Sequence, residues 1–261
     1  MKLNVVCCKW GTKYGPHYVN RLKNMVKRHY PGELIFYCYT DNAEGLDHDV
    51  IAVPFPDIPD IAPQYWFGKG EFALGLARCW DRAKTFVFNS HQWLGTSGRF
   101  MFLDLDVIVQ NDITPLVTYN FARPTMLRSW WENPKNVANR GFVVTHGTIL
   151  NGSCQVWSDN QCQCIWEDVL QFQDKIWFTY TGGTDNYHYW RWRDLWDTFP
   201  STFAYCYNRG REWPHDASVG KYRPDCILCV LNIDIVAADL PDRTKVKQDA
   251  LTDPNLLTHW R

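Results

Sequence analysis

The sequence predicts an α/β fold in which a mainly parallel central sheet is flanked by helices. Two observations favour this class. In the first half, short apolar runs of strand length alternate with segments of helical length, which is typical of a parallel sheet. The chain has 261 residues, 46% of them hydrophobic and 21% charged, so it can bury a substantial core.

The first half follows a β-loop-α-β-β-α-β order. Residues 3–8 form an apolar run suited to a buried strand, and a glycine-punctuated loop follows at 9–15. Pro16 favours the start of a helix to about residue 28, because proline is accepted in the first helical turn. Further strands are predicted at 34–40, 50–53 and 100–109, and a helix at 71–80.

Ligands of such sheets bind outside the carboxyl ends of the strands. This rule places the loops at 9–15, 41–42 and 104–106 on one rim. The second half has weaker patterns. Strands are predicted at 124–128, 142–145, 151–157 and 226–235, and a helix is predicted at 159–172. Residues 190–196 are expected to be helical or irregular, and a polar tail from about 245 is expected to pack through Leu256, Leu257 and Trp260.

Composition excludes several functions. The net charge of -1 gives no bulk attraction to nucleic acid or anionic lipid. The N-terminal apolar run is too short for a signal peptide, and no run approaches the ~18 apolar residues of a membrane span. We therefore expect a cytoplasmic protein without a transmembrane segment, which meets membranes only through a partner or a lipid-linked acceptor.

The ten cysteines are expected to be free thiols, since cytosolic reductants keep thiols reduced. Two local pairs, Cys162 with Cys164 and Cys226 with Cys229, lie too far apart in sequence for typical zinc spacing, so burial is the favoured interpretation. Aromatic residues make up 16% of the chain, including 14 tryptophans. Most should build the core, and some are candidates to stack on a sugar or a nucleobase.

The strongest chemical signal is Asp104 and Asp106 within an apolar run. A buried carboxylate needs a cation or hydrogen-bond donors. If residues 100–109 form one strand, the two side chains point to the same face and can hold Mn²⁺ or Mg²⁺ through oxygen atoms. The alternative is a strand end with solvent-facing aspartates at a turn.

Several separated motifs resemble those of one known family. Residues 9–15 and 18–22 resemble its opening donor-site loop and helix, and Leu103-Asp104-Leu105-Asp106 resembles its metal motif. Further matches are Tyr39-Thr40-Asp41, Gly68-Lys69, Asn151-Gly152-Ser153 with Val156-Trp157, and Gly183-Thr184-Asp185-Asn186. Through them the chain resembles the bacterial and viral GT-A glycosyltransferases related to the glycogenin and lipopolysaccharide galactosyltransferase group.

The resemblance implies one GT-A domain over 1–261, with a nucleotide-binding half at 1–110 and an acceptor-side half at 111–261. It implies a nucleotide-sugar donor, with a UDP-sugar expected, a glycan or lipid-linked acceptor, and surface glycan synthesis. The implied donor-binding residues are Lys9, Gly11, Thr12, Tyr14, Asp41, Lys69 and Asp104, and the implied catalytic residues on the acceptor side are Asn151 and Asp185.

Local alternatives remain open for several of these residues. Lys69 would also suit an exposed helix start, and Asp41-Asn42 would suit a simple turn. Asn151-Gly152 is also a hairpin-turn sequence, and Asp185 would serve as a helix N-cap.

One departure from the family concerns its late Phe-His-Gly strand end, whose histidine completes the metal shell. Here the stretch reads Val230-Leu231-Asn232-Ile233-Asp234, so Asn232 or Asp234 is expected to supply the oxygen instead. Without either, the enzyme would bind free metal weakly or be inactive. His188, His215 and His259 are interpreted as packing or surface residues, with His215 kept as a candidate ligand.

The sequence therefore predicts a metal-dependent glycosyltransferase that acts with retention of configuration. A degenerate GT-A protein that binds nucleotide or glycan without turnover is the first alternative. A nucleotidyltransferase is disfavoured because residues 9–15 lack the Gly-rich, Arg-containing signature of that class. A purely structural protein would leave the paired aspartates unexplained.

Overall fold

The computed structural model describes residues 1–11, 14–55, 82–135, 148–180, 183–214, 219–231 and 253–261. Its main sheet has the order β3-β2-β1-β4-β7-β6-β8. β1, β2, β3 and β4 run parallel, β7 is antiparallel to β4 and β6, and β8 is parallel to β6. The strands are β1 (Lys2–Lys9), β2 (Glu33–Thr40), β3 (Val50–Val53), β4 (Arg99–Leu103), β6 (Thr125–Arg128), β7 (Leu150–Ser158) and β8 (Asp197–Thr198).

A smaller sheet lies beside the main one, in the order β5-β10-β9. Its strands are β5 (Val107–Val109), β9 (Ala204–Cys206) and β10 (Leu228–Val230). The described helices are α1 (Pro16–His29), η1 (Arg82–Asn89), α3 (Ser90–Trp93), α4 (Thr114–Thr118), α6 (Gln163–Thr179), α7 (Thr184–Trp192) and α9 (Pro254–His259). The predicted α/β class with a mainly parallel sheet is confirmed.

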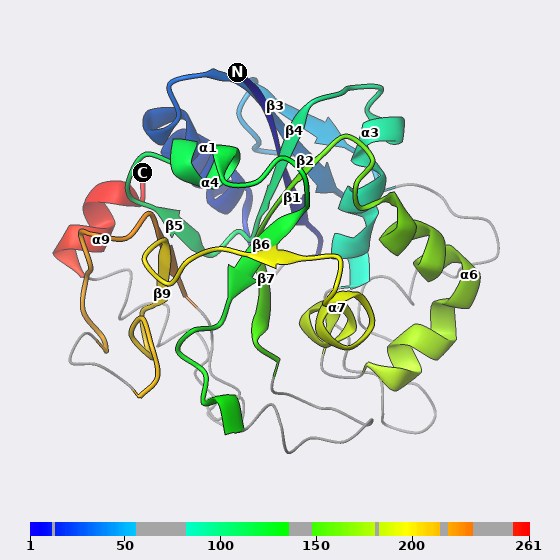
Figure 1. The fold of residues 1–261 in the computed structure, drawn as a ribbon. Helices are drawn as coiled ribbons and strands as arrows, with labels where there is room; N and C mark the ends of the chain where they lie inside the picture. The colour runs from blue at the N-terminus through cyan, green and yellow to red at the C-terminus, as the bar shows by residue number, and fades with distance from the viewer. Residues whose placement is uncertain (12–13, 56–81, 136–147, 181–182, 215–218, 232–252) are drawn as a thin grey trace.

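Helices cover both faces of the main sheet, with α1 and α9 on one side and η1, α3, α6 and α7 on the other (Figure 1). This arrangement explains the unbroken apolar run of β1. Leu3, Val5 and Cys7 belong to the core beneath α1, whereas Val6 and Cys8 belong to the core with η1 and α6. A parallel strand buried on both faces needs apolar side chains at every position rather than at alternate ones.

The predicted strand at 100–109 is wrong as a single element. β4 ends at Leu103, and β5 begins at Val107 in the other sheet. Between them the Val107 N–H donates to the Asp104 carbonyl at 3.2 Å, which closes a turn. Aspartates 104 and 106 therefore lie in the turn where the chain changes sheets, and the same-face argument for a continuous strand does not apply. Carboxylates are more easily solvated or paired in such a turn than inside a buried strand.

The other predicted elements have mixed outcomes. The strands at 124–128 and 151–157 correspond to β6 and β7. The helix expected at 159–172 begins only at Gln163, after Asp159 adopts a φ of 45°, and extends to Thr179. The segment 190–196 begins as the end of α7 and leaves the helix after Trp192. The elements predicted at 71–80 and 142–145 lie outside the described residues, as does the part of 226–235 after residue 231.

The nine described cysteines are free, and Cys162, Cys226 and Cys229 are buried while Cys164 is half-buried. Burial raises the pKa of the Cys162 thiol well above its usual value, which keeps it protonated. Nothing in the part of the chain that the structure describes forms a helix long and apolar enough to cross a membrane.

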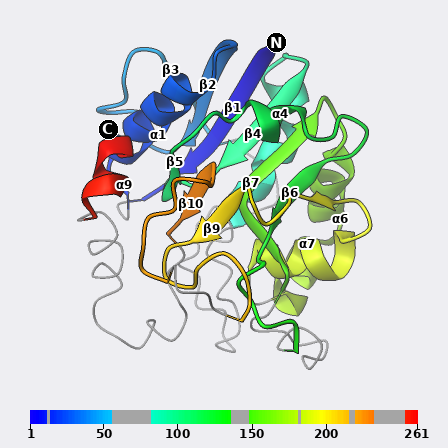
Figure 2. The same ribbon diagram turned by 60° about the vertical axis from the view of Figure 1, so that its left-hand side comes forward.

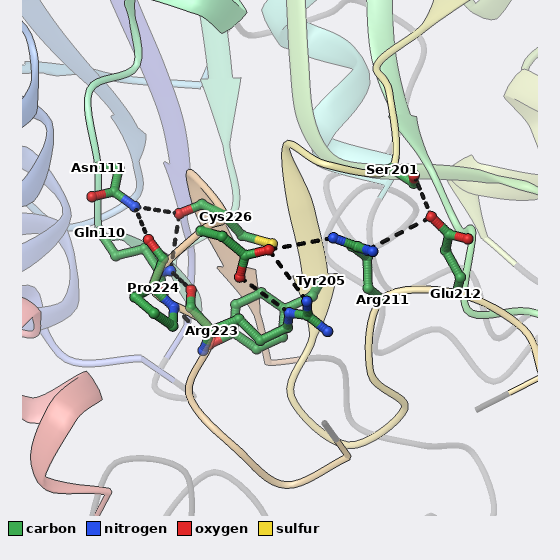
Figure 3. Close-up of polar contacts among 10 residues, drawn as sticks. Gln110, Asn111, Ser201, Tyr205, Arg211, Glu212, Arg223, Pro224 and Cys226 are labelled. Carbon is green, nitrogen blue, oxygen red and sulfur yellow. Dashed lines mark hydrogen bonds and ion pairs between the residues drawn. The ribbon is translucent and has the colours of Figure 1, made fainter. Parts of the chain in front are cut away.

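Side chains just after β5 hold the segment that leads into β10 (Figure 3). The Gln110 amide donates to the Cys226 carbonyl at 3.0 Å, and the Asn111 amide donates to the same carbonyl at 2.6 Å. The Gln110 side chain is buried. On the outer side, Arg211 lies between Asp225 and Glu212, with an Nη1–Oδ2 distance to Asp225 of 3.3 Å. The Gln110 and Asn111 contacts fix the start of β10 against the end of β5 that is farther from the two aspartates.

The tail packs through a short helix, α9. Asp253 caps it by accepting the Asn255 N–H at 2.9 Å, and Leu256 and Trp260 are buried. Leu257 was also expected to pack, but it is 42% exposed. Two histidines meet at this contact: the His29 and His259 rings lie 5.8 Å apart.

We expect acid to loosen α9. Burial lowers the pKa of both His29 and His259 below 6.5. Repulsion from His259 and then from Arg28 adds to this at His29, with Asp112 partly offsetting it, and repulsion from Arg28 adds to it at His259. Because the folded state favours neutral rings, their contribution is complete above pH 6.5 and is lost as pH falls through the lowered values. Hydrogen exchange of the α9 amides, corrected for intrinsic rates, should show lower protection at pH 5.5 than at pH 7.5. Equal protection at both pH values, or an unchanged pH effect in His259→Asn, would contradict this.

Candidate functional site

The candidate site lies at the carboxyl ends of β1, β2 and β4. β2 and β3 lie on one side of β1, and β4 lies on the other. The direction of winding therefore reverses between β1 and β4, and such a switch point is the usual ligand-binding crevice of an open parallel sheet. The loop after β1 and the turn after β4 meet at this point, as the sequence predicted for the loops at 9–15 and 104–106.

Asp104 is the centre of the polar contacts on this rim. Its backbone N–H donates to the Ser153 carbonyl at 3.0 Å, which ties the turn to β7. Its carboxylate contacts the Lys84 ammonium of η1 at 2.7 Å, and the two side chains are 18% and 21% exposed. Burial raises the pKa of Asp104, Lys84 lowers it, and nearby Asp106 raises it. The ionised form of Asp104 therefore depends on a neighbouring cation.

Asp106 receives a hydrogen bond from the loop after β1. The Tyr14 hydroxyl donates to Asp106 Oδ2 at 3.1 Å. Burial, followed by the charge of Asp106, raises the pKa of Tyr14, so the phenol keeps its proton and remains a donor. On the other side, the Leu231 N–H donates to the Asp106 carbonyl at 3.4 Å, which joins the turn to the end of β10.

The two aspartates fit a hard divalent cation. Carboxylate oxygens are the ligands that Mn²⁺ and Mg²⁺ prefer. A bound cation would also favour the charged form of Asp104 against burial and the Asp106 charge, which raise its pKa. Among the described residues, no group of three His, Cys, Asp or Glu side chains is placed to hold a metal. The predicted ligands Asn232 and Asp234, and His215, lie outside those residues.

The loop after β1 contacts the end of β2. The Gly11 N–H donates to Asp41 Oδ2 at 2.9 Å, and Gly11 has a φ of 59°, which glycine adopts readily. The buried Lys9 side chain donates to the Asn42 carbonyl at 3.4 Å. Asp41 and Lys9 thus hold the loop in place through backbone groups, which a sequence pattern does not reveal. Thr12 and Lys69 lie outside the described residues.

Asn151 and Asp185 belong to β7 and α7, two elements that contact each other beside the aspartate turn. Asn151 is buried inside β7, so its interpretation as a hairpin turn is wrong: residues 152–154 instead form an irregularity between the parts of β7 that pair with β6. Asp185 lies in the first turn of α7, whose N-cap is Gly183, so it is not the N-cap itself. The Gly152 N–H donates to Asp185 Oδ1 at 2.8 Å.

We expect Gly152→Ala to displace Asp185. A methyl group at residue 152 would lie 2.7 Å from Asp185 Oδ1, too close for any real contact. Losing this hydrogen bond and relieving the overlap should destabilise the fold by about 1–3 kcal/mol. Urea unfolding measures the loss. A free energy of unfolding within about 0.5 kcal/mol of the wild type in Gly152→Ala would contradict the expectation.

Sequence reasoning missed Lys84 as a partner of Asp104. No motif in the η1 sequence RAKTFVFN marks Lys84, and only the tertiary fold brings its ammonium to the turn. The histidines behave as expected where they are described. His188 is buried against Phe88 and Trp196, and His259 stacks on Tyr222 at a centroid distance of 5.7 Å.

This sheet order, with the aspartate turn at its switch point, is the GT-A fold of glycosyltransferases, and the resemblance seen in the sequence is confirmed at the level of the fold. The galactosyltransferase LgtC, in complex with donor and acceptor sugar analogs, is similar with a TM-score of 0.53 and 12% identity, over 99% of this chain and 100% of that one.

Other solved glycosyltransferases are similar to the same degree. GlyE of Streptococcus pneumoniae has a TM-score of 0.57 and 11% identity, over 98% of this chain and 62% of that one. Mouse xyloside xylosyltransferase 1 has a TM-score of 0.50 and 12% identity, over 89% of this chain and 98% of that one. No protein-family model and no curated protein matches the sequence. At these identities the likeness establishes the fold, and the chemistry must be argued from the site.

Proposed function

We propose that this protein is a metal-dependent glycosyltransferase that moves a sugar from a nucleoside-diphosphate sugar, with UDP as the expected carrier, to an acceptor hydroxyl. One observation carries the proposal. The paired aspartates of the turn, with the Lys84 ammonium beside them, lie at the switch point of a GT-A sheet. Two carboxylates and a cation at this place suit a metal-bound diphosphate better than any structural role.

The donor would bind along the rim. The loop after β1, fixed by Asp41 through the Gly11 N–H, would line the nucleotide pocket with Lys9 and Tyr14, and Thr12 belongs to the same loop. Lys84 would offer its ammonium to the diphosphate, the role for which Lys69 was the candidate on sequence. A lysine suits this task because its mobile point charge can follow a phosphate that moves during the reaction.

Asp104 and Asp106 would hold Mn²⁺ or Mg²⁺, with Asn232 or Asp234 as a further ligand. The ion, when bound, supplies Lewis-acid stabilisation of the charge that develops on the departing diphosphate. The protein's own task is to position the reactants and to keep the two carboxylates charged, and the Lys84 ammonium and the Tyr14 hydroxyl favour that charged state.

Asn151 and Asp185 would act on the acceptor side. Asp185 is held beside β7 by the Gly152 N–H, within the same group of contacts that fixes the aspartate turn. We expect retention of configuration, in which no strong base is needed; in an inverting enzyme Asp185 would be the base. The acceptor is proposed to be a glycan or lipid-linked glycan of the cell surface, by analogy of fold.

A second candidate is a GT-A protein that binds nucleotide without turnover. The contact that favours it is the close ion pair of Lys84 with Asp104, which already gives Asp104 a cationic partner. In such a protein Lys84 would neutralise charge permanently and nucleotide binding would be independent of metal.

Thermal melting with a panel of nucleoside diphosphates, each with Mn²⁺ or with EDTA, separates these functions. We expect one diphosphate, UDP, to raise the melting temperature only with Mn²⁺, because a ligand that binds only the folded state stabilises it. A shift that is the same in EDTA favours the non-catalytic binder. If no nucleotide shifts the melting temperature, the donor-site proposal is wrong. The sugars of the stabilising diphosphate are then tested for turnover.

A further inference from the structure

The C-terminal helix α9 lies beside α1 (Figure 2), and it also contacts β5, the strand that follows the aspartate turn. Its last residues are held from α1: the Arg28 guanidinium donates to the Arg261 carbonyl at 2.9 Å and also to the His259 carbonyl. Trp260, the C-cap of α9, is only 4% exposed, and the Arg21 guanidinium lies over its ring, 5.6 Å from the centroid. α9 is therefore firmly packed rather than a loose end.

A continuous series of aromatic contacts leads from α9 to the site. The Trp260 ring packs edge-on against Tyr18, with centroids 5.3 Å apart, and Tyr18 packs edge-on against Tyr14 at 4.9 Å. The Tyr14 hydroxyl then donates to Asp106 at 3.1 Å. Tyr14 lies just before α1, and Tyr18 lies in the first turn of α1. The position of the Tyr14 ring therefore depends on the Tyr18 ring against which it packs.

α9 also reaches the other side of the turn. The Tyr207 hydroxyl donates to Asp253, the cap of α9, at 3.2 Å, and the Tyr207 N–H donates to the Val230 carbonyl at 3.1 Å. Leu231, the next residue, donates its N–H to the Asp106 carbonyl. The helix is thus linked to Asp106 by two routes. One runs through Tyr18 to the Tyr14 hydroxyl, and the other runs through Tyr207 and β10 to the Leu231 N–H.

We propose that α9 is a positioning element for the metal-binding carboxylate: Trp260, through Tyr18, fixes the Tyr14 hydroxyl that orients Asp106. This inference rests on the proposed function, because it assigns the helix a role in divalent-cation affinity. Groups that hydrogen-bond a metal ligand orient it and raise its affinity for the ion. Trp260 and Tyr18 are positioning residues and do not touch the ion or the substrate.

The test measures Mn²⁺ affinity by electron paramagnetic resonance of the free ion, with and without UDP, in a double-mutant cycle. Tyr14→Phe removes only the hydroxyl and should weaken Mn²⁺ binding about 10-fold, the lower end of the usual effect of such a partner. Trp260→Leu should weaken it several-fold. In the Tyr14→Phe protein, the added Trp260→Leu should change affinity less than about twofold, because the contact through which it acts is already absent.

Leu257→Ala, on the exposed side of the same helix, is the matched control and should leave Mn²⁺ affinity unchanged. If Trp260→Leu does not fold, Tyr18→Leu takes its place in the cycle. The inference is overturned if Tyr14→Phe, or the replacement of Trp260 or Tyr18 used in the cycle, leaves Mn²⁺ affinity as in the wild type. It is also overturned if the Trp260 or Tyr18 replacement lowers Mn²⁺ affinity by the same factor with and without the Tyr14 hydroxyl. A wild-type protein that binds no Mn²⁺ in either condition instead overturns the proposed metal-dependent function, and this role of α9 with it.

Discussion

Asp104→Asn is expected to lower the rate of sugar transfer at least about 100-fold, because Lewis-acid stabilisation by a bound metal contributes several kcal/mol to the transition state. The amide has nearly the shape of the carboxylate but lacks its charge. Loss of the carboxylate charge weakens a metal ligand and removes an acidic partner of Lys84. The measurement is UDP release from the UDP-sugar that the binding screen identifies.

Asp194→Asn is the matched control and should leave the rate unchanged, since the Asp194 side chain is fully exposed just after the C-terminal end of α7. Thermal melting of both variants separates lost chemistry from lost folding. A rate within threefold of the wild type in a folded Asp104→Asn protein would contradict the assignment of Asp104 as a metal ligand.

Lys84→Met is expected to change two affinities in opposite directions. In the protein without nucleotide, the ammonium lies 2.7 Å from Asp104 and opposes a second cation there, so its removal should strengthen binding of Mn²⁺ alone. With Mn²⁺ present, UDP should bind about 10- to 100-fold more weakly, because a charge-assisted hydrogen bond contributes about 1.5–3 kcal/mol.

Titration calorimetry of Mn²⁺, and of UDP with Mn²⁺, measures both effects. Lys84→Arg keeps the cation and should recover part of the UDP affinity, although its planar fork has a different shape. If both affinities fall together in Lys84→Met, Lys84 only maintains the structure. If UDP affinity is unchanged, Lys84 does not contact the diphosphate.

Much of the sheet follows from local sequence because its physical causes are local. The run in β1 is apolar at every position since both faces are covered, and Pro16 marks the start of α1 by restricting its own backbone. These features need no knowledge of distant residues, which is why β1, α1, β2 and β3 could be predicted within a residue or two of their ends.

The site was only partly predictable because its contacts are tertiary. The paired aspartates allowed a strand end at a turn, as the stated alternative had it, but the apolar residues on both sides also suit one continuous strand. Nothing local indicates that Val107–Val109 join another sheet. Asn151-Gly152 has a turn sequence, yet it is buried in β7, where Gly152 is required by the closeness of Asp185. The partner of Asp104, Lys84, follows from how η1 packs beside β4 and from no motif.

The central claim is that the aspartate turn between β4 and β5 binds a divalent cation together with a nucleoside diphosphate. A crystal structure of the protein with Mn²⁺ and UDP, with data collected at the manganese absorption edge, tests this most directly. The expected result is an anomalous peak beside Asp104 and Asp106, with the nucleotide along the loop that follows β1. A nucleotide bound there without an anomalous peak, or a manganese ion found only elsewhere, would contradict the claim.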